Sequence, residues 1–185
     1  MEADTLERQA ARGDERAFTA LMTASKAALY RFVRRYVGDD DEAFDVVQEA
    51  YASAWLAIRR YDPERSFDTW LRSIAINKCR DWGRRRQVRR VVRGVMGLDA
   101  PEATQVGDDT PDAETQLADQ RRLDRVAHAI TDLPDGLKSP LLLSALEGRS
   151  HAEIAAIMGL STKAVELRVA RARRKLHEVL GRGAD

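Results

Sequence analysis

The amino-acid sequence predicts an all-α protein made of two small helical domains joined by a flexible acidic linker. Three observations support this fold class. Apolar residues recur at helical spacing over most of the 185 residues, only 6% of the residues are aromatic, and glycine and proline gather in a few short segments. Hydrophobic residues make up 44% of the chain, which is sufficient for one domain or two small ones.

Composition excludes several classes of protein. Cys79 is the only cysteine, so a disulfide within the chain and a cysteine zinc cluster are excluded, and a reduced, cytoplasmic setting is expected. The first residues are polar, and no apolar run approaches the ~20 residues of a membrane span, so we expect neither an export signal nor membrane insertion.

Two amphipathic helices are expected in the first third of the chain. Residues 14–37 carry an apolar stripe that ends at Gly38, which is typical of a core helix. Residues 41–61 begin with acids, as the helix dipole prefers, and are expected to pack through Phe44, Val47, Tyr51, Ala54, Trp55 and Ile58. The polar face of this second helix holds Asp45, Gln48 and Glu49, which on the residues alone are read as a solvated face.

A third helix with a basic outer side is expected next. Asp62 and Pro63 suit an N-cap and a first helical position, and apolar periodicity follows from Phe67. The exposed side is predicted to bear Arg72, Asn77, Lys78 and Arg80, and the helix continues into six arginines between positions 84 and 93. Such density indicates an anionic partner. Nucleic acid is favoured over acidic lipid because no large apolar face accompanies the arginines, and a disordered basic tail is the remaining alternative.

Charge is strongly segregated along the chain although its net value is only +1. Residues 70–98 contain nine basic residues and one acid, whereas residues 99–119 contain seven acids and no base. Glycines and prolines interrupt the helical pattern from Gly94 to about Ala118. This segment is interpreted as a linker.

The segment from Gly148 to Leu176 predicts a helix-turn-helix. Ser150 and Glu153 form a capping-box pair, Gly159 ends the first helix, and Ser161 or Thr162 begins the second. The second helix has a packing stripe of Val165, Val169, Ala172 and Leu176. Its free face is rich in cations, which suits a recognition helix in the major groove, and a solvated basic helix is the alternative. The free face and its flanks comprise Lys163, Leu167, Arg168, Ala170, Arg171, Arg173, Arg174 and Lys175.

Two further helices are expected to support the helix-turn-helix. The first follows the periodicity from Leu117 to Leu133, and the second is a short apolar helix from Leu141 to Leu146 with Ser139 as its cap and Pro140 as its first residue. No catalytic motif was found, and the three histidines are scattered, so neither an enzyme nor a metal site nor a cofactor is expected.

Three motifs together resemble the extracytoplasmic-function (ECF) group of the sigma-70 family. They are DVVQEAYASAW from Asp45, RSFDTWLRSIAINKCRDWGRRR from Arg65, and the Leu133-Pro134 pair followed by EGRSHAEIAAIMGLSTKAVELRVARARRKL from Glu147. The resemblance implies an RNA polymerase sigma factor with a sigma-2 domain at residues 1–93, a linker at 94–118 and a sigma-4 domain at 119–182. In the family this linker threads the polymerase cleft.

The resemblance also implies roles for individual residues. Asp45, Gln48 and Glu49 would contact core RNA polymerase, with Trp55 supporting them. The loop at residues 63–66 would hold a base flipped from the minus-ten element of the promoter. The minus-ten contacts are expected from Ser66, Trp70, Asn77, Lys78, Arg80, Arg84, Arg85 and Arg86.

The helix-turn-helix would read the minus-thirty-five element through Lys163, Glu166, Leu167, Arg168, Ala170, Arg171, Arg173 and Arg174. The sequence departs from the family here, because Glu166 and Leu167 stand where a cation and a serine are usual. Glu166 would either accept from cytosine or pair with Arg173 or Arg174. Pro140 and the Asp135-Gly136 pair are also departures, which predict a shortened helix at that point.

The expected partners are core RNA polymerase, through its beta and beta-prime subunits, promoter DNA and an anti-sigma factor, with the free protein a monomer. The alternative is a dimeric helix-turn-helix regulator that acts on duplex DNA without polymerase. That alternative requires a palindromic site and a dimerisation helix, and no heptad seam occurs between Leu117 and Leu146.

Overall fold

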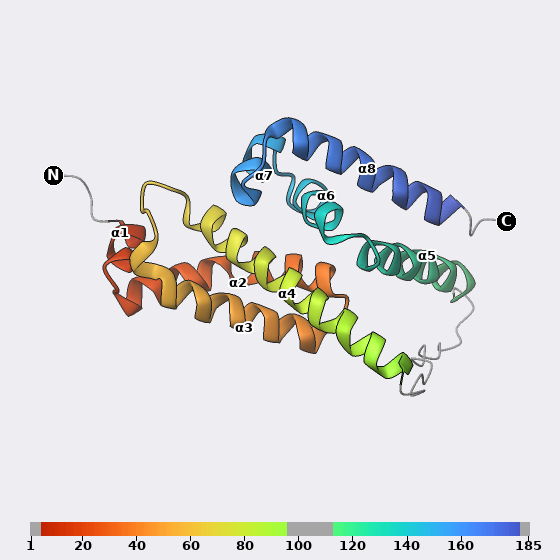
Figure 1. The fold of residues 1–185 in the computed structure, drawn as a ribbon, viewed down its shortest axis with the longest axis horizontal. Helices are drawn as coiled ribbons and strands as arrows, with labels where there is room; N and C mark the ends of the chain where they lie inside the picture. Colours follow the sequence, from red (N-terminus) through yellow and green to blue (C-terminus); the bar gives the residue numbers. More distant parts are fainter. Residues whose placement is uncertain (1–4, 96–112, 182–185) are drawn as a thin grey trace.

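The computed structural model describes residues 5–95 and 113–181, and every regular element in these two ranges is helical. An N-terminal bundle contains α1 (Leu6–Ala11), α2 (Glu15–Val37), α3 (Asp40–Ala57), the short 3-10 helix η1 (Ile58–Arg60) and α4 (Phe67–Val95). A C-terminal unit contains α5 (Ala113–Thr131), α6 (Asp135–Glu147), α7 (His151–Met158) and α8 (Thr162–Gly181). Figure 1 shows the two units side by side. The predicted all-α, two-domain architecture is confirmed.

The N-terminal bundle forms because α2, α3 and α4 each bury one apolar face against the other two. Asp14 caps α2 by accepting from the backbone N–H of Ala17 at 2.9 Å, and Gly38 ends the helix in the left-handed conformation with φ +88°. Asp39 caps α3 in the same way. These bounds match the expected helices, apart from the last turn of the second, which is the 3-10 helix η1.

The start of the third helix differs from the prediction. Residues 62–66 form a turn rather than a first helical turn, and α4 begins at Phe67. Asp62 accepts from the backbone N–H of Glu64 at 3.0 Å, so its side chain stabilises the turn locally instead of capping a helix. Ser66 takes the capping position, since its Oγ accepts from the N–H of Thr69 at 3.4 Å.

The predicted linker at residues 94–118 falls mostly on residues 96–112, outside the described ranges. At its ends the chain is helical, because α4 continues to Val95 and α5 begins at Ala113. The segment from Ala113 to Ala118 combines alanine, glutamate, glutamine and leucine, which are good helix formers. The acidic character of the segment predicts a linker, but the helix propensity of these residues prevails from Ala113 onward.

Helix α6 is also longer than predicted. It runs from Asp135 to Glu147 and carries Pro140 inside it, so Ser139 does not cap a helix and the expected shortening was wrong. Ser139 is fully buried, and its Oγ donates to the carbonyl of Asp135. The proline costs one backbone hydrogen bond in the second turn, but burial of Leu141, Leu142 and Leu143 holds the helix together.

The helix-turn-helix is confirmed as predicted. Ser150 and Glu153 make both hydrogen bonds of the capping box, and Gly159 ends α7 with φ +64°. Helix α8 buries Val165, Val169 and Ala172, and it extends beyond Leu176 to Gly181. Helix α8 therefore has a buried inner face and an exposed outer face.

Candidate nucleic-acid and polymerase surfaces

One face of α3 presents the first group of predicted contact residues. Asp45 and Gln48 are exposed, and Glu49 is partly exposed beside α4. Trp55 is half-buried, and its ring packs on Phe18 with the centroids 5.0 Å apart, so it stiffens the bundle behind this face. The structure brings these residues onto one helix surface, which we call the α3 face.

The α3 face also contains two large apolar residues that the sequence reading missed. Phe44 is 52% exposed, contrary to its predicted packing role, and Leu56 is 86% exposed. Together with Gln48 and Ala52 they form a row with four-residue spacing along the helix. This four-residue spacing is the feature of the sequence from which the exposed row could have been predicted. Exposed apolar side chains beside polar ones are typical of a protein interface.

The turn before α4 is held rigidly by an aromatic cluster. The ring of Tyr61 lies 4.8 Å from that of Trp70 and 5.7 Å from that of Phe67. Its hydroxyl donates to the carbonyl of Arg65 at 2.5 Å, and burial raises the pKa of Tyr61 to about 12. A hollow of about 520 Å³ adjoins the turn, lined by Leu21, Ser25, Pro63, Glu64, Arg65, Ser66, Phe67 and Asp68 among others. Its volume is within the range of small-molecule sites.

The basic residues of α4 divide among several faces. At about 100° per residue, Trp70, Asn77, Arg80 and Arg84 lie within an arc of about 80° that points away from the bundle. We call this arc the outer face of α4. Asn77 and Arg84 are exposed, whereas Trp70, Lys78 and Arg80 are half-buried. Ser66 is exposed in the turn that precedes the helix.

Arg85 and Arg86 do not lie on the outer face of α4. Arg85 pairs with Glu49 of the α3 face at 3.1 Å. Arg86 lies 5.3 Å over the ring of Trp82, and it donates to the carbonyl of Val37 at 3.5 Å. These two arginines therefore serve contacts inside the N-terminal bundle in this structure.

Arg72 was expected on the exposed side of α4, and this expectation was wrong. Its side chain is only 4% exposed, and it forms ion pairs with Asp68 at 3.2 Å and with Glu147 of α6 at 2.7 Å. The helical wheel gives the reason, since position 72 shares its side of the helix with the buried Ala75 and Cys79. An arginine on an otherwise apolar side requires acidic partners, and the fold supplies two.

The outer face of α8 carries the predicted minus-thirty-five residues together. Lys163, Glu166, Leu167, Ala170, Arg171, Arg173 and Arg174 are exposed, and Arg168 is half-buried. Glu166 pairs with Lys163 at 3.0 Å rather than with Arg173 or Arg174. Leu167 is 47% exposed among the cations. The cations suit phosphate and guanine, and the leucine adds an apolar contact point.

The described parts of the chain contain no group of three or more histidine, cysteine, aspartate or glutamate residues arranged to hold a metal ion. In the same residue ranges, no helix combines the length and the apolar character that a bilayer span requires.

The structure combines an α3 face suited to protein contact, a basic outer face on α4 and a helix-turn-helix. Together these features define a helical transcription protein with two DNA-directed units. Residues 21–90 match the family described as Sigma-70 region 2, and residues 123–176 match the family described as Sigma-70, region 4. The chain belongs to the ECF group of the sigma-70 family of RNA polymerase sigma factors. Sigma factors are not enzymes in themselves.

Relatives support this assignment over nearly the whole chain. The chain is 40% identical to RNA polymerase sigma factor CnrH of Cupriavidus metallidurans, an alignment that covers 93% of this chain and 91% of that protein. It is 33% identical to the ECF RNA polymerase sigma-E factor of Haemophilus influenzae, with 87% and 86% covered.

Two solved structures resemble the fold. CnrH in complex with the cytosolic domain of CnrY superposes with a TM-score of 0.68 at 34% identity, covering 95% of each chain. The sigma factor RpoE in complex with the anti-sigma factor NepR from Bartonella quintana gives a TM-score of 0.63 at 24% identity, with 89% of this chain and 96% of that chain covered. The second match supports the fold alone.

Proposed function

We propose that this sigma factor divides its work between two ends of the chain. Residues 1–93 bind core polymerase and open the minus-ten element, and residues 119–182 position the protein on the minus-thirty-five element. Residues 94–118 connect these two domains. One observation carries the first assignment. The α3 face and the outer face of α4 are exposed surfaces of two different helices and share no residue, so polymerase and promoter DNA are able to bind at the same time.

The polymerase contact is assigned to the α3 face. Asp45, Gln48 and Glu49 supply polar contacts to the beta and beta-prime subunits, and Trp55 supports them from behind. Phe44 and Leu56 extend the contact as apolar anchors. Their side chains are largely exposed, so covering them with a partner stabilises the complex.

The minus-ten element is assigned to the turn at residues 62–66 and to the outer face of α4. A base flipped from the duplex enters the hollow beside Ser66, and Trp70 supports this site from behind because its ring packs on Phe67, which lines the hollow. Asn77, Arg80 and Arg84 then follow the strand and its phosphates, and Lys78, which lies about 80° beyond the edge of this face, adds a flanking phosphate contact. Arg85 and Arg86 join them only if they leave their present partners.

The minus-thirty-five element is assigned to the outer face of α8. Lys163 and Glu166 form a weak, exposed pair that DNA is able to open, and the remaining contacts fall to the other residues of this face. These are Leu167, Ala170, Arg171 and Arg174, with Arg168 and Arg173 at the flanks. Leu167 contacts a thymine methyl group, which replaces the usual polar contact with an apolar one.

The protein acts in the cytoplasm as a monomer when free, has no catalytic activity of its own, and is held inactive by an anti-sigma factor. CnrH is seen in complex with the cytosolic domain of CnrY. The near-complete coverage of CnrH, at 34% identity, supports a partner of the same kind for this chain.

A footprinting experiment tests the division of labour. The chain mixed with core polymerase should protect two separated elements on one asymmetric promoter and make bases of the downstream element reactive to permanganate. The chain alone should give no such opening. A symmetric duplex footprint formed without polymerase would contradict the proposal and favour a dimeric regulator.

A further inference from the structure

Helix α1 forms one wall of the hollow beside Ser66, although it lies outside residues 21–90, which match the sigma-70 family. The helix packs against α2 and η1. Arg8 of α1 pairs with Glu64 of the turn at 2.9 Å, so the helix is linked directly to the proposed minus-ten turn. Glu7, the neighbour of Arg8 in the sequence, lines the hollow. This N-terminal helix therefore contributes a side chain to the proposed base pocket.

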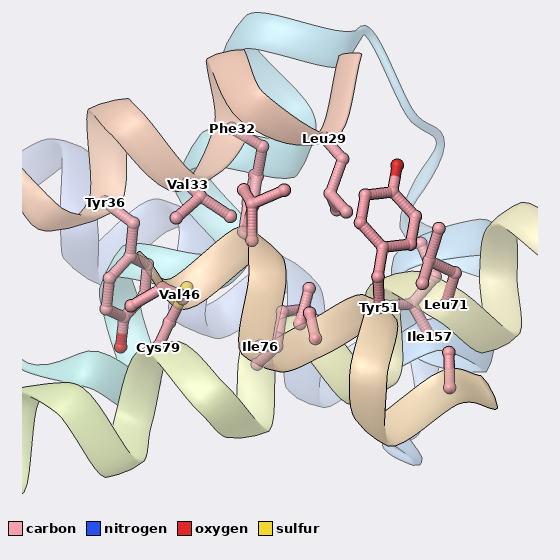
Figure 2. Close-up of a cluster of buried hydrophobic side chains, with 14 of the residues drawn as sticks. Leu29, Phe32, Val33, Tyr36, Val46, Tyr51, Leu71, Ile76, Cys79 and Ile157 are labelled. Atoms are coloured by element: carbon pink, nitrogen blue, oxygen red, sulfur yellow. The ribbon is translucent and has the colours of Figure 1, made fainter. Parts of the chain in front are cut away.

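Most polar side chains that line the hollow are already bound within the protein. The hydroxyl of Ser25 lies 2.9 Å from that of Tyr51, a member of the buried cluster shown in Figure 2. The carboxylate of Glu64 is held by Arg8. The carboxylate of Asp68 forms ion pairs with an arginine of α4 and with the arginine two residues before α7. These groups are therefore poorly placed to accept a hydrogen bond from a base.

Glu7 and Arg65 are the ionised side chains of the lining that have no hydrogen-bond or ion-pair partner among the residues that the structure describes. Glu7 is half-buried, and Arg65 is exposed. Burial, followed by the negative charge of Glu7, raises the pKa of Tyr61 to about 12, so Glu7 lies close to the aromatic cluster of the turn. A half-buried carboxylate without a partner gains a charge-assisted hydrogen bond when a donor enters the hollow. Glu7 is therefore the free acceptor of this site.

The natural bases differ in what they present to such an acceptor. An ionised carboxylate only accepts hydrogen bonds. Adenine, cytosine and guanine each carry an exocyclic amino group that donates, whereas thymine presents carbonyl oxygens on both sides of its ring N–H. A carboxylate beside a carbonyl oxygen is repelled, and both groups are left without a donor. Arg65 offsets the charge of Glu7, so the phosphates of the strand are not repelled from the turn.

We propose that Glu7 makes the minus-ten pocket selective for a flipped base that carries an exocyclic amino group, and that it discriminates against thymine. The inference rests on the proposed entry of a flipped base into this hollow. It assigns base selectivity to a residue of α1, and it gives Arg8 a positioning role, since the pair with Glu64 holds α1 against the turn. A good base-specific contact of this kind corresponds to a selectivity of about fivefold or more.

Binding of single-stranded minus-ten oligonucleotides to core polymerase carrying the full-length protein tests this selectivity. Each position of the element carries every natural base in turn, and then an abasic residue, and fluorescence anisotropy measures the affinity. A position at which an abasic residue weakens binding marks a base pocket. At one such position the base that binds most tightly should carry an amino group, and thymine should bind at least about fivefold more weakly.

Glu7→Gln and Glu7→Ala should each reduce this discrimination to about twofold or less, because an amide also donates to thymine and a methyl group bonds to no base. Glu15→Gln is the matched control. It removes the same charge from an exposed position at the start of α2 that does not line the hollow, and it should keep the wild-type discrimination.

A matching change in the DNA isolates the amino group. Purine in place of adenine, 2-pyrimidinone in place of cytosine, or hypoxanthine in place of guanine removes only that group from the preferred base. The replacement should weaken binding to the wild-type complex and leave binding to Glu7→Ala unaltered, because the two changes remove the same contact.

Wild-type discrimination in both Glu7 variants would overturn the proposal and leave the base pocket itself standing. Equal binding of thymine and the amino-bearing bases at every position that needs a base would overturn it in the same way. The proposed role of the hollow fails differently. If an abasic residue is tolerated at every position of the element, no base enters a pocket, and both the pocket and its selectivity are wrong.

Discussion

The carboxylate of Glu49 on α3 accepts hydrogen bonds from the guanidinium of Arg85 on α4, at 3.1 and 3.3 Å. One residue belongs to the proposed polymerase contact and the other to the proposed minus-ten contact. Both side chains are about half exposed, so the pair stabilises the fold by ~1 kcal/mol or less. It is weak enough for polymerase to take Glu49 and release Arg85 toward DNA.

Gln48→Ala combined with Glu49→Ala should weaken binding to core polymerase by about 1–3 kcal/mol, or roughly 5-fold to 150-fold, because two polar interface contacts are lost. Fluorescence anisotropy with labelled protein measures this affinity. Arg85→Ala is the matched control, since it breaks the same ion pair from the DNA side and should leave polymerase affinity unchanged. An unaltered affinity in the double variant would refute the role of the α3 face.

Tyr61→Phe should slow promoter opening several-fold while leaving polymerase affinity intact. The substitution keeps the ring that packs on Phe67 and Trp70, and it removes only the hydroxyl that holds the Arg65 carbonyl. The loss in folding stability should be about 0.5–1.5 kcal/mol. A fluorescent base analogue in the minus-ten element reports opening in a stopped-flow instrument. Equal opening rates would show that the turn at residues 62–66 needs no such support.

Leu167→Ala should lower affinity for the minus-thirty-five element by about 3-fold to 5-fold through loss of one methyl contact. Replacing the contacted thymine by deoxyuracil removes the same methyl group from the DNA. Each change alone should therefore cost about the same, and the two together should cost little more than either one. Fully additive losses at every thymine of the element would exclude contact between Leu167 and a thymine methyl.

Arg171→Ala should relax discrimination at one position of the upstream element by about 1–3 kcal/mol if the guanidinium reads a guanine. Binding to a set of single-base promoter variants measures the discrimination. Lys175→Ala, on the flank of the same helix, is the control for a general loss of charge. A uniform loss on all variants would assign Arg171 to a phosphate.

The capping box of α7 predicts a local pH effect. Hydrogen bonds from the side chain and backbone of Ser150 lower the pKa of Glu153. Because the folded pKa lies below the unfolded one, the stabilisation is complete above the ordinary pKa of glutamate and disappears as the pH falls through the lowered value. An NMR titration should give a lowered pKa for Glu153 that returns toward the ordinary value in Ser150→Ala. The same pKa in both proteins would show that the cap does not act on this carboxylate.

Sequence periodicity was sufficient to predict the helices because each helix buries one apolar stripe. In α8 this stripe consists of Val165, Val169 and Ala172. Periodicity failed where a local rule competed with packing. Pro140 suggested a helix start, but burial of the leucines after it carries the helix through the proline. Asp62 suggested a cap, but its side chain closes a turn instead.

The candidate surfaces could be predicted from the sequence where all their residues belong to one helix. Wheel positions place Gln48 on the α3 face and Arg171 on the outer face of α8. Arg72 and Arg85 each have a partner on another helix, Glu147 and Glu49, which lie 75 and 36 positions away in the chain. No periodicity encodes such pairings, because they depend on how the helices pack in three dimensions. The ion pairs of Arg72 with Glu147 and of Arg85 with Glu49 therefore could not be predicted from the sequence alone.

Transcription reconstituted from purified components is the most direct test of the proposed division of labour. Core polymerase, this sigma factor and a promoter selected by the complex should yield a specific transcript. At a protein concentration near the wild-type Kd for core polymerase, that transcript should fall when the protein carries Gln48→Ala with Glu49→Ala, and it should be lost from templates in which either promoter element is scrambled. An undiminished transcript from the double variant under these conditions, or a transcript that needs only one of the two elements, would contradict the account.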